Sequence, residues 1–130
     1  MASDFPDLVA RFVGSLASGV PGGFDKLCGD ASNRSYYRAP DPERGTVMIM
    51  KLADDPLKSE EAVDGERPRD VPFLDVARYL AAGGVPVPDV LHVDLAAGVI
   101  VLVDLGDVTV ERALAAGANK LDLYRNAIRL

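Results

Sequence analysis

The fold is decided by a polar loop, Gly29-Asp30-Ala31-Ser32-Asn33-Arg34, and by the apolar run that follows a few residues later, Thr46-Val47-Met48-Ile49-Met50. The loop passes into the strand-like residues Ser35-Tyr36-Tyr37-Arg38, and the apolar run ends on Lys51. Burying an unpaired ammonium group is strongly unfavourable, so a lysine at the end of a buried strand needs an anion nearby. We therefore expect Lys51 to have a negatively charged partner.

The residues around this stretch predict a helix followed by three antiparallel strands. Residues 4–18 place apolar side chains at helical spacing, and Ser3 or Asp4 can cap the helix. Short strands are expected at 24–28 and 35–39, on either side of the polar loop. A turn through Pro40 and Gly45 then leads into the strand that ends on Lys51.

The second half of the chain predicts a helix, a strand pair and two further helices. Residues 54–69 are charged and lack an apolar stripe, which favours a surface segment, whereas residues 72–82 repeat apolar side chains as a helix with one buried face does. The run 99–105 is continuously apolar, which is typical of a strand buried on both faces. The remaining expected elements are a strand at 90–95 and helices at 109–116 and 121–130, the last reaching Leu130 without a C-cap, from which we expect the sequence to continue.

Composition excludes several classes of function. The 130 residues suffice for one domain, and the net charge of −6 disfavours binding to nucleic acid or to anionic membranes. A single cysteine, Cys28, cannot form an intramolecular disulfide, and no Cys/His cluster offers zinc ligands. The N-terminus is acidic, and no apolar run is long enough to cross a membrane. We therefore expect a cytoplasmic protein.

Three motifs, in matching order, carry a resemblance to a known family. They are the stretch 29–38, Val85-Pro86-Val87-Pro88-Asp89-Val90-Leu91, and Val101-Leu102-Val103-Asp104-Leu105-Gly106-Asp107. Together they resemble the aminoglycoside-phosphotransferase family of small-molecule kinases, and most of all the bacterial kinases of N-acetylmuramate and N-acetylglucosamine. The resemblance implies an α+β fold, the N-terminal lobe of a protein-kinase-like enzyme, with a five-stranded antiparallel sheet, a packed helix at 72–82 and an extra N-terminal helix. Residues 1–106 would be the nucleotide-binding half, and residues 107–130 the hinge and the start of a helical C-terminal lobe.

The resemblance also implies site residues. Lys51 would hold the phosphates of ATP, and the side chains of Ser32, Asn33 and Arg34 would add donors and positive charge from the loop. At the hinge, the backbone of Asp104, Leu105 and Gly106 would pair with the adenine edge, where a glycine permits a close approach.

Structural alternatives stand beside each of these assignments: Lys51 as a strand-edge lysine, the loop as an ordinary polar hairpin, and 104–107 as a plain turn. The carboxylate partner of Lys51 is undecided. With Phe73 at the centre of the buried helix face, Asp75 falls on the solvent side. The remaining candidates are Asp70, Glu60, Glu61 and Glu66.

The triplet His92-Val93-Asp94 looks like the start of a kinase catalytic loop but is interpreted as part of a strand. The loop would need an asparagine five residues after the aspartate, and Val99 stands there. In the resembled family the catalytic base and the magnesium ligands come from a His-Gly-Asp-x-x-x-x-Asn stretch and a later aspartate, and this sequence has neither. We therefore expect no catalytic or metal-binding residue in this chain.

The predicted function is ATP- and Mg²⁺-dependent transfer of phosphate to a hydroxyl of a small molecule, with an amino sugar as the first choice of acceptor. An aminoglycoside or choline kinase is the alternative within enzymes, and a non-catalytic kinase-like binding module is the alternative outside them. The chain alone should be inactive. Apolar residues of strand 99–105 and of the last helix, among them Leu121, Tyr124 and Ile128, are expected to be exposed and to drive self-association.

Overall fold

The computed structural model describes residues 3–19, 22–27, 34–52 and 72–129. The chain divides into two compact units, each of which is described by itself. The first comprises Met1–Pro72 and Pro88–Asp104, and the second comprises Phe73–Val87 and Leu105–Leu130. The division between 1–106 and 107–130 that the sequence favours stays a prediction.

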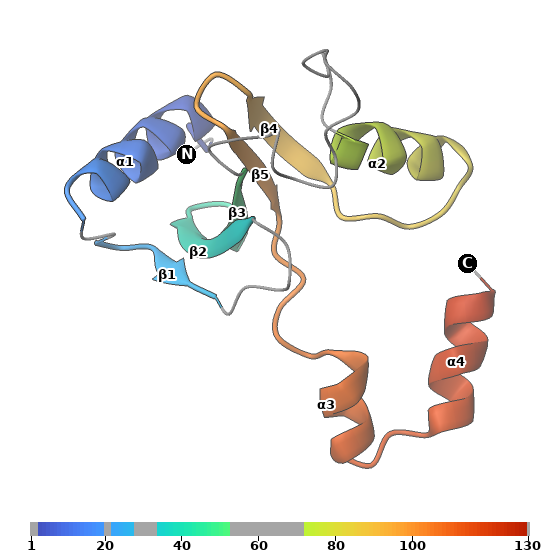
Figure 1. The fold of residues 1–130 in the computed structure, drawn as a ribbon. Helices are drawn as coiled ribbons and strands as arrows, with labels where there is room; N and C mark the ends of the chain where they lie inside the picture. Colours follow the sequence, from blue (N-terminus) through green and yellow to red (C-terminus); the bar gives the residue numbers. More distant parts are fainter. Residues whose placement is uncertain (1–2, 20–21, 28–33, 53–71, 130) are drawn as a thin grey trace. The chain divides into compact units, whose positions relative to one another are not determined.

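The first unit is built on one five-stranded antiparallel sheet (Figure 1). The strand order is β1-β2-β3-β5-β4, and every neighbouring pair is antiparallel. The predicted α+β class and the five antiparallel strands are therefore confirmed. The strands are β1 (Asp25–Lys26), β2 (Ser35–Asp41), β3 (Gly45–Lys51), β4 (Val90–Asp94) and β5 (Val99–Val103).

Helix α1 (Phe5–Ala17) covers one face of this sheet, as Figure 1 shows. It begins at Asp4, whose carboxylate accepts a hydrogen bond from the backbone N–H of Asp7 and so satisfies a free donor of the first turn. Phe12 lies at the centre of the core, fully buried, with its ring edge-to-face against Phe24 and Tyr37. The rest of the buried cluster consists of Leu8, Val9, Ala39, Val47, Ile49, Val99 and Val101.

Alternation along each strand sends neighbouring side chains to opposite faces of the sheet. Val47 and Ile49 lie beneath α1, so Met48 and Met50 belong to the other face. In β5 the four residues Val99–Leu102 are all buried, so both faces of this strand are covered. The prediction of a strand buried on both faces is confirmed.

Several strand boundaries differ from the sequence-based prediction: β5 ends at Val103 and not at Leu105, and β1 and β2 differ as follows. Strand β1 is restricted to two residues, and Phe24 packs in the core instead of pairing. Strand β2 continues through Ala39 and Pro40, where a turn is predicted, and Pro40 pairs in register with Thr46. The backbone carbonyl of Tyr36 points toward β1, and by alternation the backbone nitrogen of Pro40 points to the same side of β2. Strand β1 does not reach Pro40, because its last paired residue, Asp25, lies opposite Arg38. The missing N–H of this proline therefore costs no ladder hydrogen bond.

Helix α2 (Pro72–Ala82) has the predicted bounds, but its buried stripe is rotated. Leu74 is the buried residue, whereas Val76, which the sequence pattern places in the apolar stripe, is 55% exposed. The stripe is centred nearer Leu74 than Phe73, and Val76 lies about 200° from Leu74 around the helix. Asp75 is exposed, as predicted, and pairs with Arg78 at 3.3 Å. Packing of this helix on the sheet stays a prediction.

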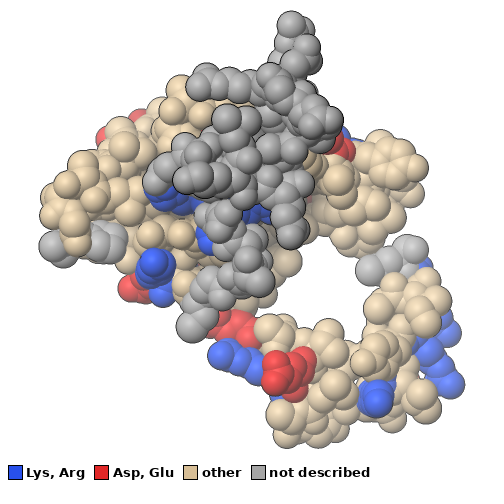
Figure 2. Space-filling view, viewed as in Figure 1, with Lys and Arg blue, Asp and Glu red and all other residues tan. Residues whose placement is uncertain are grey.

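Two short helices follow Gly106. The side chain of Thr109 caps α3 (Val110–Ala115), and that of Asn119 caps α4 (Lys120–Ile128). Helix α4 ends at Ile128 with Arg129 as its C-cap, so the expectation of a last helix that reaches Leu130 without a C-cap is wrong. Basic side chains lie along α4 in Figure 2. None of the helices in the described ranges is long and apolar enough to cross a membrane.

The predicted exposure of apolar side chains near the end of the chain is only partly confirmed. Leu121, Tyr124 and Ile128 of α4 are exposed, as predicted. The expectation of exposed residues in strand 99–105 is wrong for Val99–Leu102, because both faces of β5 are covered, although Leu105 beyond its end is exposed.

Candidate functional site

The end of β3 brings Lys51 beside the start of β2. Lys51 lies opposite Ser35 on one side and opposite Val99 on the other. Arg34 directly precedes Ser35, so the polar loop that ends at Arg34 joins the sheet at the Lys51 end. The structure thus brings two of the predicted phosphate contacts, Lys51 and Arg34, to the same end of the sheet.

Lys51 lies on the α1 side of the sheet. It shares this side with Val47 and Ile49 by alternation and with Val99 by register. The side chain is half-buried, and its Nζ donates to the carbonyl oxygen of Leu52 at 3.4 Å. The core beneath α1 is filled by apolar side chains. Lys51 can therefore contact a ligand at the end of the sheet, but not one lying on the face of the sheet beneath α1.

Arg34 also has a partly buried side chain, and its Nη2 atom is buried. A guanidinium held at the rim of the sheet suits an oxyanion, because its donors match phosphate geometry. Ser32 and Asn33, the other two loop predictions, lie outside the described residues. So do the candidate carboxylate partners Asp70, Glu60, Glu61 and Glu66, whose assignment therefore stays open.

The predicted hinge lies at the opposite end of β5. Val99 is level with Lys51, and Asp104 comes five residues later, about 17 Å along an antiparallel strand. After Asp104 the exposed Leu105 and Gly106 leave the sheet. Gly106 has a φ of +82°, a conformation that other residues adopt only with strain.

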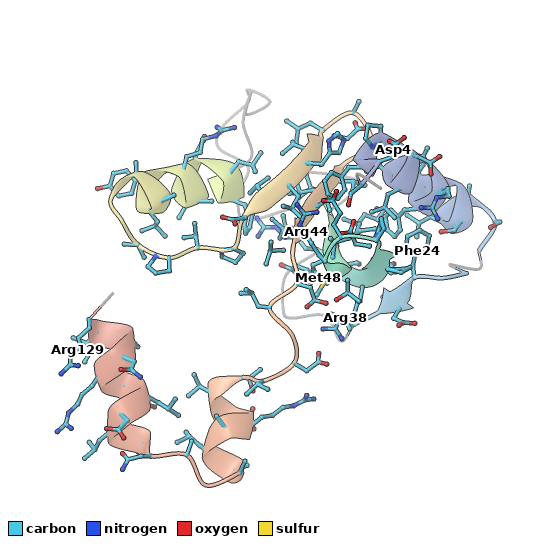
Figure 3. All side chains as sticks on the ribbon, turned by 180° about the vertical axis from the view of Figure 1, so that it is seen from behind. Asp4, Phe24, Arg38, Arg44, Met48 and Arg129 are labelled. Atoms are coloured by element: carbon cyan, nitrogen blue, oxygen red, sulfur yellow. The ribbon has the colours of Figure 1, made fainter. Side chains whose placement is uncertain are left out.

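The side chain of Asp104 has a role that the sequence did not indicate. Its Oδ2 accepts hydrogen bonds from Arg38 Nε at 2.5 Å and from Thr46 Oγ1 at 2.8 Å, and its Oδ1 accepts from Arg38 Nη2 at 3.1 Å. The Asp104 side chain is 4% exposed and that of Arg38 20%. Arg38 lies opposite Met48 in the register, and both point to the side away from α1 (Figure 3).

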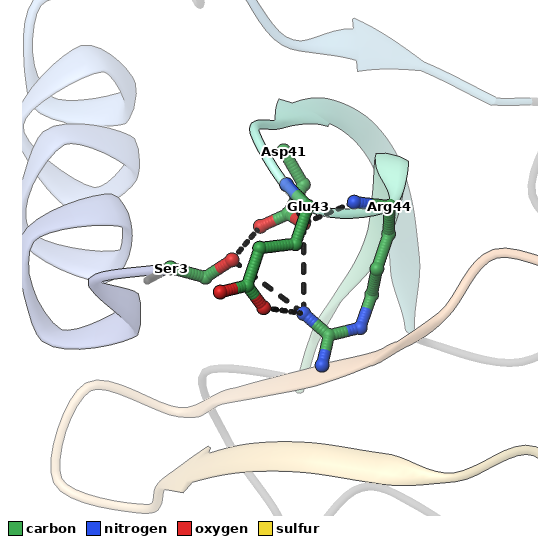
Figure 4. Close-up of polar contacts among 4 residues, drawn as sticks. All are labelled: Ser3, Asp41, Glu43 and Arg44. Carbon is green, nitrogen blue, oxygen red and sulfur yellow. Dashed lines mark hydrogen bonds and ion pairs between the residues drawn. The ribbon is translucent and has the colours of Figure 1, made fainter. Parts of the chain in front are cut away.

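A second buried carboxylate, Asp41, joins Ser3, which precedes α1, to the β2–β3 turn (Figure 4). Its Oδ1 accepts from Ser3 Oγ at 2.5 Å, and its Oδ2 accepts from the backbone N–H groups of Glu43 at 3.1 Å and Arg44 at 2.8 Å. Burial raises the pKa of Asp41, but these hydrogen bonds and the Arg44 charge outweigh burial, so the pKa lies below its usual value. The turn sequence Asp41-Pro42-Glu43-Arg44, with an aspartate as its first residue, is the signal that could have identified this contact.

Two residues of the His92-Val93-Asp94 triplet contact other parts of the fold. The His92 ring stacks on Phe5 with centroids 6.2 Å apart, and the carboxylate of Asp94 accepts from the backbone N–H of Ala97 at 3.0 Å. Both side chains are half-buried, as expected for His92. Asp94 therefore braces the turn between β4 and β5.

No three His, Cys, Asp or Glu side chains within the described ranges gather so as to hold a metal ion. Magnesium prefers oxygen ligands from carboxylates and phosphates. The two buried carboxylates of the first unit, Asp41 and Asp104, are already engaged by the donors named above. Among the described residues there is therefore no assembled set of carboxylates for Mg²⁺, and the nucleotide contacts stay a prediction.

Comparison with known proteins gives a distant similarity to a kinase. No family model matches the chain, and no solved structure matches it. The chain is 33% identical over 119 residues to an N-acetylmuramate/N-acetylglucosamine kinase of Caulobacter vibrioides, a match that covers 80% of this chain and 33% of that kinase. This similarity supports a relationship to kinases. The chain spans about a third of the length of the curated relative that it matches.

Proposed function

We propose that the protein containing this chain is an ATP-dependent phosphotransferase that acts on a hydroxyl of an amino sugar, and that this chain supplies its nucleotide-binding lobe. The observation that carries the proposal is the 33% identity to an amino-sugar kinase across most of the chain. The finer assignment, to the aminoglycoside-phosphotransferase family with a protein-kinase-like fold, rests on the three motifs. Acceptor and magnesium contacts are proposed to come from residues outside this chain.

The geometry supports this proposal at two places. Lys51 and Arg34 put two positive charges at one end of the sheet, beside the polar loop. Phosphoryl transfer depends mainly on positioning and on neutralising the charge of the phosphates, so fixed cations are the contribution expected of a nucleotide-binding lobe. At the far end of β5, Asp104, Leu105 and Gly106 follow the last strand residue, Val103, at the position where the resemblance places the contact with the base.

The chemistry assigned to this lobe is binding and orientation. Lys51 and Arg34 would hold the phosphates in place while the acceptor hydroxyl attacks the terminal phosphorus, and the 104–106 backbone would hold the base. Bound Mg²⁺ would supply charge neutralisation between phosphate oxygens. The non-catalytic alternative shares the binding step and lacks the transfer.

The test is product formation by the full-length protein. We expect ATP with Mg²⁺ to phosphorylate N-acetylglucosamine or N-acetylmuramate, detected as a new sugar phosphate by ³¹P NMR, and a panel of aminoglycosides and choline to give no product. ATP binding without any phosphorylated acceptor would favour the non-catalytic module. Transfer to an aminoglycoside or to choline alone would move the protein to the alternative enzyme class.

A further inference from the structure

We infer that Arg38, Thr46 and Asp104 form a positioning cluster that fixes the backbone of residues 104–106 for binding of the nucleotide base. The inference rests on the proposed function and adds a set of residues that act through the hinge without touching the reacting atoms. The cluster joins the β2–β3 hairpin to the residue that follows β5: 66 positions separate Arg38 from Asp104, and 58 separate Thr46 from Asp104.

The three hydrogen bonds of the cluster named above converge on one carboxylate. Arg38 binds both oxygens of Asp104 through Nε and Nη2, the two-point geometry in which a guanidinium recognises a carboxylate most specifically. Thr46 adds a third donor to Oδ2. Because the carboxylate is almost fully buried, its position is set by these donors and not by water.

The place of the cluster in the chain explains what it does. The paired residues of β3 and β5 end at Val47 and Val103, and Asp104 is the next residue. Asp104 is also the last residue of the first unit. The hydrogen bonds of its side chain therefore hold the chain just beyond the last ladder pair, and they fix the position at which the 104–106 backbone begins.

Alternation along the strands shows on which side of the sheet the cluster lies. Arg38 and Thr46 alternate with Tyr37, Ala39 and Val47, which are buried beneath α1, so the cluster faces away from α1. Because the backbone of residues 104–106 is the proposed contact for the base, a small displacement of this backbone would lower the affinity for the nucleotide.

Steady-state kinetics of the full-length protein, with ATP varied at saturating amino sugar, tests the inference. Asp104→Asn keeps the size of the side chain and removes its charge. We expect the KM for ATP to rise about tenfold, as for loss of a charge-assisted hydrogen bond, with kcat changed less than about threefold. Thr46→Val removes one donor and should raise the KM by about threefold, whereas Thr46→Ser keeps the donor and should behave as wild type.

Controls separate positioning from general stability. Asp7→Asn makes the same charge change in the exposed Asp7–Arg11 pair of α1 and should leave the KM for ATP unchanged. Thr46 is exposed, so its variants remain informative if Asp104→Asn does not fold. A lowered melting temperature with an unaltered KM in both Thr46→Val and Asp104→Asn would show a purely structural role and overturn the inference. Absence of any ATP-dependent transfer by wild type would instead refute the proposed function on which the inference rests.

Discussion

Replacing Phe12 with alanine should destabilise the first unit more than any other single change in α1. Phe12 is fully buried, and its ring meets Phe24 with centroids 5.3 Å apart and Tyr37 with centroids 4.9 Å apart. Core Phe→Ala substitutions lower the free energy of unfolding by about 3–5 kcal/mol, because burial is lost and a cavity is left behind. This range already includes most of the stability that edge-to-face aromatic pairs contribute. We expect a loss of about 4 kcal/mol, a large fraction of the roughly 5–15 kcal/mol that stabilises a typical domain.

Urea titration followed by circular dichroism and by tyrosine fluorescence measures this loss. With a slope of about 2 kcal/mol per molar urea, the unfolding midpoint should fall by about 2 M. Val13→Ala, in the next position of the same helix, is the matched control: Val13 is 39% exposed, and its truncation should cost less than about 1 kcal/mol. Equal midpoints for the two variants would refute the packing of α1 on the sheet, and with it the reasoning that confines Lys51 to the end of the sheet.

Three further predictions follow from individual contacts. Asp41→Asn should lower the free energy of unfolding by about 1–3 kcal/mol at neutral pH, because two backbone donors and Ser3 lose a charged acceptor. Folding lowers the pKa of Asp41 from 3.8, so the stabilisation that the Asp41 carboxylate provides is present above pH 3.8 and is lost as the pH falls through the pKa of the folded state. Thermal unfolding at stepped pH should therefore show the difference in melting temperature between Asp41→Asn and wild type shrinking below pH 3.8. Asp75→Asn should change stability by less than about 0.5 kcal/mol in the same melts, since the pair with Arg78 is exposed on both sides. Gly106→Ala should weaken ATP binding in calorimetry by about fivefold, because an alanine at a φ of +82° is strained by about 1 kcal/mol and the hinge would shift to relieve it, whereas unchanged affinity would mean that the hinge conformation does not matter.

The elements of the fold could be predicted because their signals are local. Apolar spacing defined α2 at 72–82 with the observed bounds, and the unbroken run at 99–105 indicated a strand covered on both faces. Local sequence signals fail to predict a residue's conformation where the neighbouring strands determine it. Pro40 reads as a turn residue, yet it continues β2 because the short β1 leaves that side of the strand without a partner.

The sequence could predict those features of the candidate site that depend on chain order, but not those that depend on the register between strands. Sequence order alone predicts that the loop before Ser35 and the strand ending at Lys51 lie close together, and pairing of Ser35 with Lys51 agrees. The side of the sheet on which Lys51 lies, and the bonds from Arg38 and Thr46 to Asp104, depend on which residues stand opposite one another in three strands. A one-residue change of register would reverse the side, and no local pattern specifies it.

The central claim, that nucleotide phosphates bind at the Lys51 end of the sheet, is tested most directly by calorimetric titration of an ATP analogue with Mg²⁺ into the full-length protein. Lys51→Ala removes the charge at the end of β3, and Lys26→Ala removes an equivalent charge from the exposed strand β1 as a control. We predict that the Kd rises at least about tenfold for Lys51→Ala and changes by less than about twofold for Lys26→Ala, because only a cation in contact with phosphate contributes a charge-assisted bond. Equal Kd values for wild type and Lys51→Ala would contradict the claim.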